Sequence, residues 1–430
     1  MTHRISSLPS PAGMSSDGVF LDAAASIGRR ILRDAVWHEG RCSWMGAVVD
    51  ALQPWGLEYR ALEPNLYNGT AGVGLFLAQL AAVTGDTAVH RTAVGAMRHA
   101  ITRVPAMAPA RRAGFHAGSL GIAWAAARAA KLLDEEELLV SARRIPFVAK
   151  PPAGSDRGSD VNSGRAGTII ALLALAEELD DSALVEEARV TGEELLARAT
   201  ITRHGWSWAF RGPRYRRHLC GLLHGAAGIG WALLELFVAT EEERFRAGAT
   251  GAFAFERSWL DTRSGTWPDL RIGGQRRGAA RPIASPALGT WCHGEGGIAM
   301  TRLRAIEVLE TRTYAHDAEV ALEATRLDLA RSLPYEIEDL TLCHGAAGSA
   351  DVLLCGAAAL GEQSRDAATL AGELGRVTLE RHDVNRNEWP CGVAGGTTPA
   401  LFRGLSGIAW WFLRLHDRAI PSPLAMPTRG

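Results

Sequence analysis

Two Cys-His pairs, Cys292-His293 and Cys343-His344, have the side chains that bind a soft divalent metal. Each pair stands directly before a glycine. A catalytic zinc site uses three protein donors, drawn from thiolates, imidazoles and carboxylates, and keeps a fourth position open. Two thiolates and one imidazole, from either His293 or His344, meet this requirement. A lone Cys-His pair is more often a buried core pair, but the repetition favours a catalytic metal site over that, and over a closed four-ligand structural site.

The two pairs belong to a longer repeat, in which a Gly-x-x-Gly turn opens into an apolar stretch of helical period. Glycine allows a positive φ and the close approach of two helices, so each turn marks the same structural corner. The spacing of roughly fifty to seventy residues leaves room for two helices and their loops. The seven turns begin at Gly69, Gly118, Gly164, Gly225, Gly294, Gly345 and Gly404.

The stretches that follow the turns, such as 229–236 and 408–415, are nearly free of charge. Helices that are apolar on most sides are buried, whereas amphipathic stretches such as 181–198 are half exposed. We therefore predict an all-α fold, an α/α toroid with a double ring of seven inner and seven outer helices. An open solenoid is the alternative. It would need polar capping repeats, and the last unit, 401–415, is as apolar as the others.

The ring also predicts how close the two cysteines lie. Cys292 and Cys343 each stand two residues before the repeat glycine in consecutive units, so the toroid brings them side by side at one end. Each precedes a helix N-terminus, where the helix dipole favours a thiolate.

Composition indicates one large soluble domain. The chain has 430 residues, 47% of them hydrophobic, and a formal charge of −1, which gives no reason to expect binding to nucleic acid. We predict a disordered tail over 1–18, one domain over 19–418 and a C-terminal tail over 419–430. The N-terminus lacks a signal-peptide pattern, and no apolar run predicts membrane insertion. We expect a cytoplasmic protein, compatible with association with a membrane-bound modification or export complex.

Taken together, these motifs resemble the lanthionine synthetase C-like family, the zinc-dependent cyclases of lanthipeptide biosynthesis. The resemblance runs from Asn65 to the last glycine turn, and the family fold is a double α/α ring. It implies that the zinc ligands are Cys292, Cys343 and His344, which leaves His293 as a neighbour. The specific motifs are Trp291-Cys-His-Gly, Leu342-Cys-His-Gly, His218-Leu-Cys-Gly-Leu-Leu-His-Gly and Asp160-Val-Asn-Ser-Gly.

The resemblance implies the reaction. A cysteine thiol of a dehydrated precursor peptide adds to dehydroalanine or dehydrobutyrine and forms a lanthionine or methyllanthionine thioether ring, while zinc keeps the attacking sulfur deprotonated. The resulting enolate needs a proton on carbon, which suits a histidine. His224, in the register of His344, takes this acid/base role, and Asp160 orients it. A helix-capping role for His224 and a turn role for Asp160 are the structural alternatives.

Two further residues, His116 and Trp291, are expected to have structural roles. His116 stands at the register of the zinc cysteines in the second unit, and we expect a structural role for it. Trp291 precedes the first zinc ligand, where we expect it to pack the rim of the site, with substrate contact as the alternative.

Other functions compete with cyclisation. An enzyme of the same family that adds glutathione to dehydrated protein sites would use the same zinc ligands, and a scaffold for a modification complex would need no catalysis. Zinc-dependent prenyl transfer would use an Asp-Cys-His set instead. His293 resembles the cyclase domains of bifunctional enzymes, but the chain is too short for a fused dehydratase, so we expect a separate dehydratase as partner.

One segment departs from the family pattern, and another is unusually rich in turn residues and arginine. Many members place an arginine shortly before the first zinc cysteine, where this chain reads Ser285-Pro-Ala-Leu-Gly-Thr. His293 or Arg403 could replace that cation. The segment 262–289 is dense in Gly, Pro and Arg. It reads as a surface loop, or as a guide for an acidic leader peptide through Arg271, Arg276 and Arg277.

Overall fold

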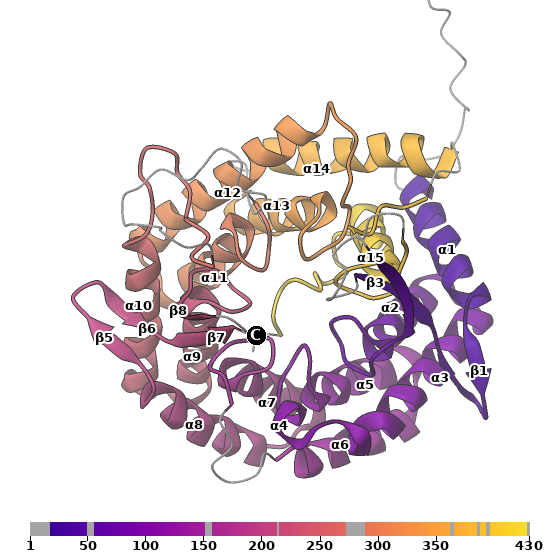
Figure 1. The fold of residues 1–430 in the computed structure, drawn as a ribbon, viewed down its shortest axis with the longest axis horizontal. Helices are drawn as coiled ribbons and strands as arrows, with labels where there is room; N and C mark the ends of the chain where they lie inside the picture. The colour runs from indigo at the N-terminus through magenta and orange to yellow at the C-terminus, as the bar shows by residue number, and fades with distance from the viewer. Residues whose placement is uncertain are drawn as a thin grey trace, which may run out of the picture.

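The structure, a computed structural model, describes residues 18–49, 56–150, 157–212, 215–271, 289–361, 365–384, 388–392 and 396–427. Of the predicted N-terminal tail, residues 1–17 lie outside this range. The described chain forms a closed ring of helices in two layers, seen along its axis in Figure 1.

The inner layer is built from helices that each begin directly after a repeat glycine. Each contacts the next inner helix along the chain, and the last contacts the first, so the ring is closed. Within the described residues there are seven inner helices, which are α2 (Thr70–Thr84), α5 (Ser119–Leu133), α7 (Arg165–Leu179), α9 (Ala226–Thr240), α11 (Glu295–Leu309), α13 (Ala346–Leu360) and α15 (Leu405–His416).

The outer layer covers each inner helix with one amphipathic partner. Six of these partners follow their inner helix in sequence, but the partner of α15 is the N-terminal helix α1, so the two ends of the described chain close the ring together. The predicted α/α toroid is confirmed. Among the described residues, the outer helices are α1 (Gly18–Arg33), α3 (Thr87–Arg103), α6 (Glu136–Ala149), α8 (Ala183–Leu196), α10 (Glu243–Arg257), α12 (Arg312–Ser332) and α14 (Arg365–Thr378).

The glycine turns owe their composition to crowding. Gly69 and Gly225 cap their helices with φ of −124° and −110°, which any residue adopts, so positive φ is the wrong explanation for the first glycine of the turns. The second glycine lies within the helix, against the corner of its own unit. At Gly121 a Cβ would overlap the carbonyl oxygen of Phe115, and the equivalent glycines meet the equivalent oxygens. The turn therefore requires glycine because backbone packs on backbone.

Replacing Gly121 with alanine should therefore destabilise the fold by about 1–3 kcal/mol, because the atom in the way belongs to the backbone and cannot turn aside. Urea unfolding followed by circular dichroism measures the change. Gly372→Ala in α14 is the matched control, since its Cβ would meet only the Arg376 guanidinium at 3.9 Å. The control should gain about 0.5–1 kcal/mol. An unchanged midpoint for Gly121→Ala would contradict the crowding explanation.

Four short antiparallel hairpins interrupt the helical repeat within the described residues. Two follow α1 and two follow α8, so they precede α2 and α9 respectively, and β7 and β8 lie toward the ring centre in Figure 1. These hairpins were not predicted from the sequence. The pairs are β1 (Val36–His38) with β2 (Arg41–Ser43), β3 (Met45–Val49) with β4 (Leu57–Ala61), β5 (Thr200–Thr202) with β6 (Gly205–Ser207), and β7 (Ala209–Gly212) with β8 (Tyr215–His218).

The segment after α15 turns into the ring instead of leaving it, although the predicted domain ends at 418. Ile420, Leu424 and Met426 are buried. The Trp291 indole N–H donates to the Leu424 carbonyl oxygen at 3.1 Å, and Trp410 donates to Pro421 at 3.0 Å. In Figure 1 this yellow segment runs from α15 toward the centre. Separately, none of the described helices is long and apolar enough to cross a membrane.

Candidate metal and acid-base site

One position of the repeat forms a backbone ring around the toroid axis. It is the residue two places before each repeat glycine. Backbone hydrogen bonds join neighbouring corners, for example from Leu223 N–H to the Cys292 carbonyl at 2.9 Å and from Cys343 N–H to the Phe402 carbonyl at 2.9 Å. The residues at this position are Tyr67, His116, Asn162, Leu223, Cys292, Cys343 and Phe402.

This backbone ring has one gap. Among the described residues, such hydrogen bonds join six of the seven pairs of neighbouring corners. The exception is the pair that carries Cys292 and Cys343. There the two thiol groups meet instead. Sequence reasoning placed these cysteines side by side from their register, and the structure brings them together at this gap.

Cys292, Cys343 and His344, the ligands that the resemblance implied, lie together in a cluster whose donor atoms could hold a metal ion. One ligand atom from each lies within 4.8 Å of the others, and Cys343 Sγ is 3.7 Å from His344 Nε2. Both thiols are buried, whereas His344 is exposed. Two soft sulfurs with one imidazole suit zinc, and the exposed histidine side leaves room for a fourth ligand. The donor set therefore fits a zinc ion with an open position.

The two buried thiols titrate as a pair. Burial opposes ionisation of Cys292, but hydrogen bonds with Cys343, His293 and His344 outweigh it and lower its pKa well below the ordinary value. Burial and the neighbouring Cys292 raise the pKa of Cys343 well above its ordinary value. Two negative sulfurs this close repel each other unless a cation lies between them, so the arrangement favours a bound metal ion.

Tyr67 is a neighbour of the cluster that sequence reasoning missed. Its hydroxyl donates to Cys343 Sγ at 2.9 Å. Burial, followed by the charges of Cys343 and Cys292, raises the pKa of Tyr67, so the phenol stays protonated and remains a donor. The signal that could have found it is its register, because it occupies in the first unit the position that the cysteines occupy in theirs.

His224 and Asp160 form a hydrogen-bonded pair. His224 Nδ1 lies 2.7 Å from Asp160 Oδ2. The other carboxylate oxygen of Asp160 accepts from the backbone N–H groups of Ser163 at 3.0 Å and Gly164 at 2.7 Å. One oxygen of Asp160 therefore holds the turn and the other holds His224. The turn role and the orienting role considered from the sequence are compatible.

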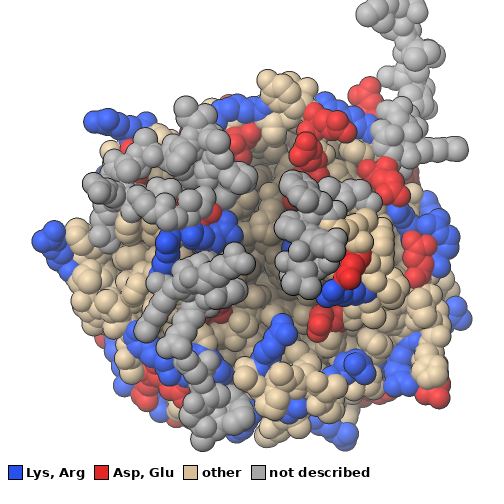
Figure 2. All heavy atoms as spheres, viewed as in Figure 1, with Lys and Arg blue, Asp and Glu red and all other residues tan. Residues whose placement is uncertain are grey.

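The position directly before the repeat glycine carries a second row of side chains beside the cluster. His293 stacks on His224 with ring centroids 5.3 Å apart and hydrogen-bonds to Cys292. Arg403 lies near enough to Cys343 to lower its pKa. Figure 2 shows that this view of the ring is hollowed near its centre, with mostly uncharged side chains there. His293 and Arg403 therefore lie beside the Cys-Cys-His cluster, as the replacement of the family's arginine by either of them would require.

Glu256 of α10 supports the corner that carries His224, and sequence reasoning gave no hint of it. Its Oε1 accepts from Gly221 N–H at 2.9 Å and from Ala227 N–H at 3.1 Å. Burial raises its pKa to about 7, although Arg302 and these two N–H groups favour the charged form. The carboxyl group therefore holds the loop before α9 in place from the outer layer of helices.

The raised pKa of Glu256 predicts a pH dependence of stability. Between the ordinary pKa of 4.5 and about 7, the folded protein keeps a proton that the unfolded chain has lost. Stability therefore falls as pH rises through this window, by up to about 1.4 kcal/mol per pH unit. Glu256→Gln keeps an acceptor oxygen and should remove this part of the slope, which urea unfolding at pH 5 and pH 8 would measure. Parallel changes in the variant and the original protein would contradict the assignment.

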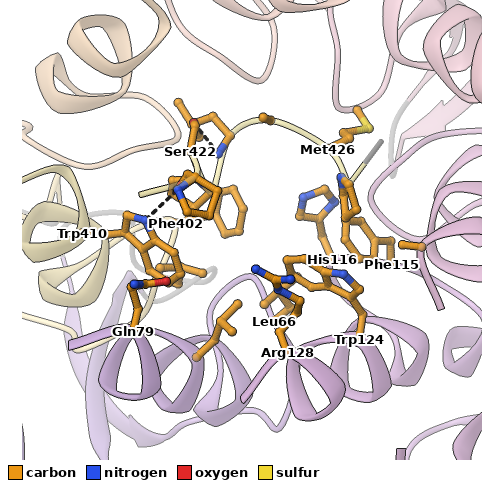
Figure 3. A pocket seen from close by; sticks show the side chains of 18 of the residues that line it. Leu66, Gln79, Phe115, His116, Trp124, Arg128, Phe402, Trp410, Ser422 and Met426 are labelled. Carbon is orange, nitrogen blue, oxygen red and sulfur yellow. Dashed lines mark hydrogen bonds between the residues drawn. The ribbon is translucent and has the colours of Figure 1, made fainter. Parts of the chain in front are cut away.

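A pocket of about 280 Å³ lies between α5 and the C-terminal segment. Figure 3 shows Trp124 and Arg128 rising from α5 on one side, with Ser422 of the C-terminal segment on the other. His116 lines this pocket. Burial lowers its pKa to about 3, and its Nδ1 has no hydrogen-bond partner among the described residues. Trp291 is likewise buried: its N–H donates to the Leu424 carbonyl oxygen, and its ring stacks on Phe402.

The proposed peptide-guiding loop is described only at its ends. Arg276 and Arg277, with the rest of 272–288, lie outside the described residues. Arg271 forms an ion pair with Asp269, with nitrogen and oxygen 2.7 Å apart.

Fold and site together define a class, a closed α/α toroid with a Cys-Cys-His cluster and a His-Asp pair at one end. The chain belongs to the lanthionine synthetase C-like family, whose model, "Lanthionine synthetase C-like protein", matches residues 60–425. Among solved structures, nisin cyclase is similar at 15% identity with a TM-score of 0.65, covering 94% of this chain and 95% of that one. A family 76 glycoside hydrolase from a bovine Bacteroides thetaiotaomicron strain aligns at 13% identity with a TM-score of 0.49, covering 93% and 78%. The likeness to nisin cyclase is a likeness of the whole fold.

Proposed function

We propose that this protein is a zinc-dependent lanthipeptide cyclase that joins cysteine thiols to dehydroalanine or dehydrobutyrine in a dehydrated precursor peptide. The observation that carries the proposal is the cluster of Cys292, Cys343 and His344 within 4.8 Å, in a chain of this family. The similarity to nisin cyclase in fold adds support.

Cys292, Cys343 and His344 would hold the zinc ion, and the exposed side at His344 would admit the peptide. A bound zinc ion keeps a substrate thiol deprotonated at neutral pH. Addition then forms one S–Cβ bond and opens the carbon–carbon double bond, and the electron pair moves onto the enolate. The proton lost from sulfur balances the proton gained by the α-carbon, so no other reactant is consumed.

His224 supplies that proton to carbon. Its Nδ1 is hydrogen-bonded to Asp160 at 2.7 Å, so Nε2 is the atom that donates the proton to carbon. The carboxylate stabilises the imidazolium and fixes the ring orientation, as an acidic partner does in other His-based acid/base pairs. Asp160 is itself held by the N–H groups of Ser163 and Gly164, so the donor is oriented before the peptide arrives.

The test is a thiol count on a dehydrated precursor peptide. The enzyme should accelerate the loss of alkylatable thiols, one for each ring formed, with no change in peptide mass before alkylation. Peptide without enzyme is the control for spontaneous addition. A gain of glutathione mass on dehydrated protein would instead identify the glutathione-adding activity. Equal thiol loss with and without enzyme would reject catalysis and leave a scaffold role.

A further inference from the structure

We infer that Tyr67 is a positioning residue that protects the protein's own ligand sulfur. Its hydroxyl, 2.9 Å from Cys343 Sγ, makes the Cys343 thiolate a poorer nucleophile than the sulfur of the substrate. The inference rests on the proposed function, because it matters only where a dehydrated residue is brought beside the cluster. It assigns a role within the reaction to a residue of the first repeat unit.

The site presents a problem of selectivity. Cys292 and Cys343 are thiolates when they hold a metal ion, and each is chemically able to add to a dehydrated residue as the substrate sulfur does. Such an addition would form an S–Cβ bond to the protein and open the carbon–carbon double bond of the dehydrated residue. With a proton from His224 or water on the α-carbon, the ligand would become a thioether. Because a thioether is a much weaker zinc ligand than a thiolate, one such event would damage the enzyme.

A hydrogen bond to a thiolate withdraws charge from sulfur and lowers its nucleophilicity, as outer-sphere donors tune the ligands of other metal sites. Tyr67 donates such a bond to Cys343. His293 makes a hydrogen bond to Cys292. Each of the two protein sulfurs therefore accepts a hydrogen bond, Cys343 from Tyr67 and Cys292 from His293. Both donors point at the ligand sulfurs that must not react.

The packing of Tyr67 fixes the direction of its hydroxyl. Its ring stacks on Phe402 with centroids 5.2 Å apart and planes 14° apart, and it meets the edge of His116 at 6.4 Å. Its backbone is held on both sides, since its N–H donates to the His116 carbonyl at 3.0 Å and its carbonyl accepts from Phe402 N–H at 3.1 Å. The phenol is therefore a preorganised donor.

Tyr67→Phe tests the inference because it keeps the stacked ring and removes only the hydroxyl. With the zinc-loaded protein and no peptide, iodoacetamide should alkylate Cys343 about tenfold faster in the variant, as expected for loss of a hydrogen bond to a charged group, while Cys292 changes little. Peptide mapping by mass spectrometry gives the rate at each cysteine. In the cobalt-substituted protein, the sulfur-to-metal charge-transfer band should move to lower energy. Tyr335→Phe, on an exposed tyrosine, is the matched control.

An unchanged alkylation rate at Cys343, with metal content and circular dichroism intact, would overturn the inference. If Tyr67→Phe does not fold, Phe402→Leu provides the second test, since it removes the stack that aims the hydroxyl and should also accelerate alkylation of Cys343. These measurements need no peptide. A protein whose Cys343 is shielded by Tyr67 but which fails to accelerate cyclisation would reject the proposed function alone, and the reverse outcome would reject only this inference.

Discussion

Replacing Cys292 with alanine should lower the zinc content from about one ion per chain to nearly none, and enzyme-dependent cyclisation should disappear with it. The variant leaves only Cys343 and His344, and two protein donors hold zinc poorly against dialysis. Elemental analysis after dialysis against a weak chelator measures the metal, and the thiol count measures the reaction.

Cys355→Ala is the matched control for this prediction. Cys355 lies in α13, the helix that follows the second ligand pair, and its sulfur contacts the Arg414 guanidinium at 3.6 Å, outside the metal cluster. The control should bind zinc and cyclise peptide as the original protein does. If Cys292→Ala kept a full complement of zinc, the assigned ligand set would be wrong.

Replacing His224 with asparagine should leave zinc binding intact and slow cyclisation by about 10²–10⁴-fold, the range that a positioned general acid contributes. The prediction separates proton transfer from metal binding, because His224 is not part of the three-residue cluster. Initial rates of thiol loss, measured at matched zinc content, provide the readout.

Asp160→Asn refines the same experiment. The amide keeps an oxygen for the Ser163 and Gly164 N–H groups, so the turn should persist, but the charge that faces His224 is lost. We expect a smaller loss of rate than for His224→Asn, with stability changed by less than about 1 kcal/mol. A full rate in His224→Asn would remove the acid/base role from both residues.

The fold was predictable because its repeating element obeys a local rule. The seven turn glycines coincide with the starts of the inner helices, since a Cβ at the second glycine would collide with backbone in each unit. The four hairpins obey no such rule, because strands such as Val36–His38 and Thr200–Thr202 are too short to show a period. The pairing of α1 with α15 was equally hidden, because those helices lie at opposite ends of the sequence.

The site was predictable where register and residue type agree. Cys292, Cys343 and His224 all stand just before a repeat glycine and belong to types that bind metal or carry protons. Tyr67 shares the register, but a phenol is not expected among zinc ligands, so its contact with Cys343 depended on the structure. Glu256 does not share the register, because it reaches the corner from the outer layer. Such support comes from tertiary packing, which the repeat does not encode.

The closure of the ring by α1 and α15 has a consequence for synthesis of the chain. Six inner helices find their outer partner in the segment made immediately afterwards, whereas α1, made first, must wait for the last inner helix. During translation its apolar face therefore stays uncovered by that partner until α15 has been made. A circular permutant that moves residues 18–33 behind α15 would turn this distant pairing into a local helical hairpin, and all units would then be equivalent in chain order.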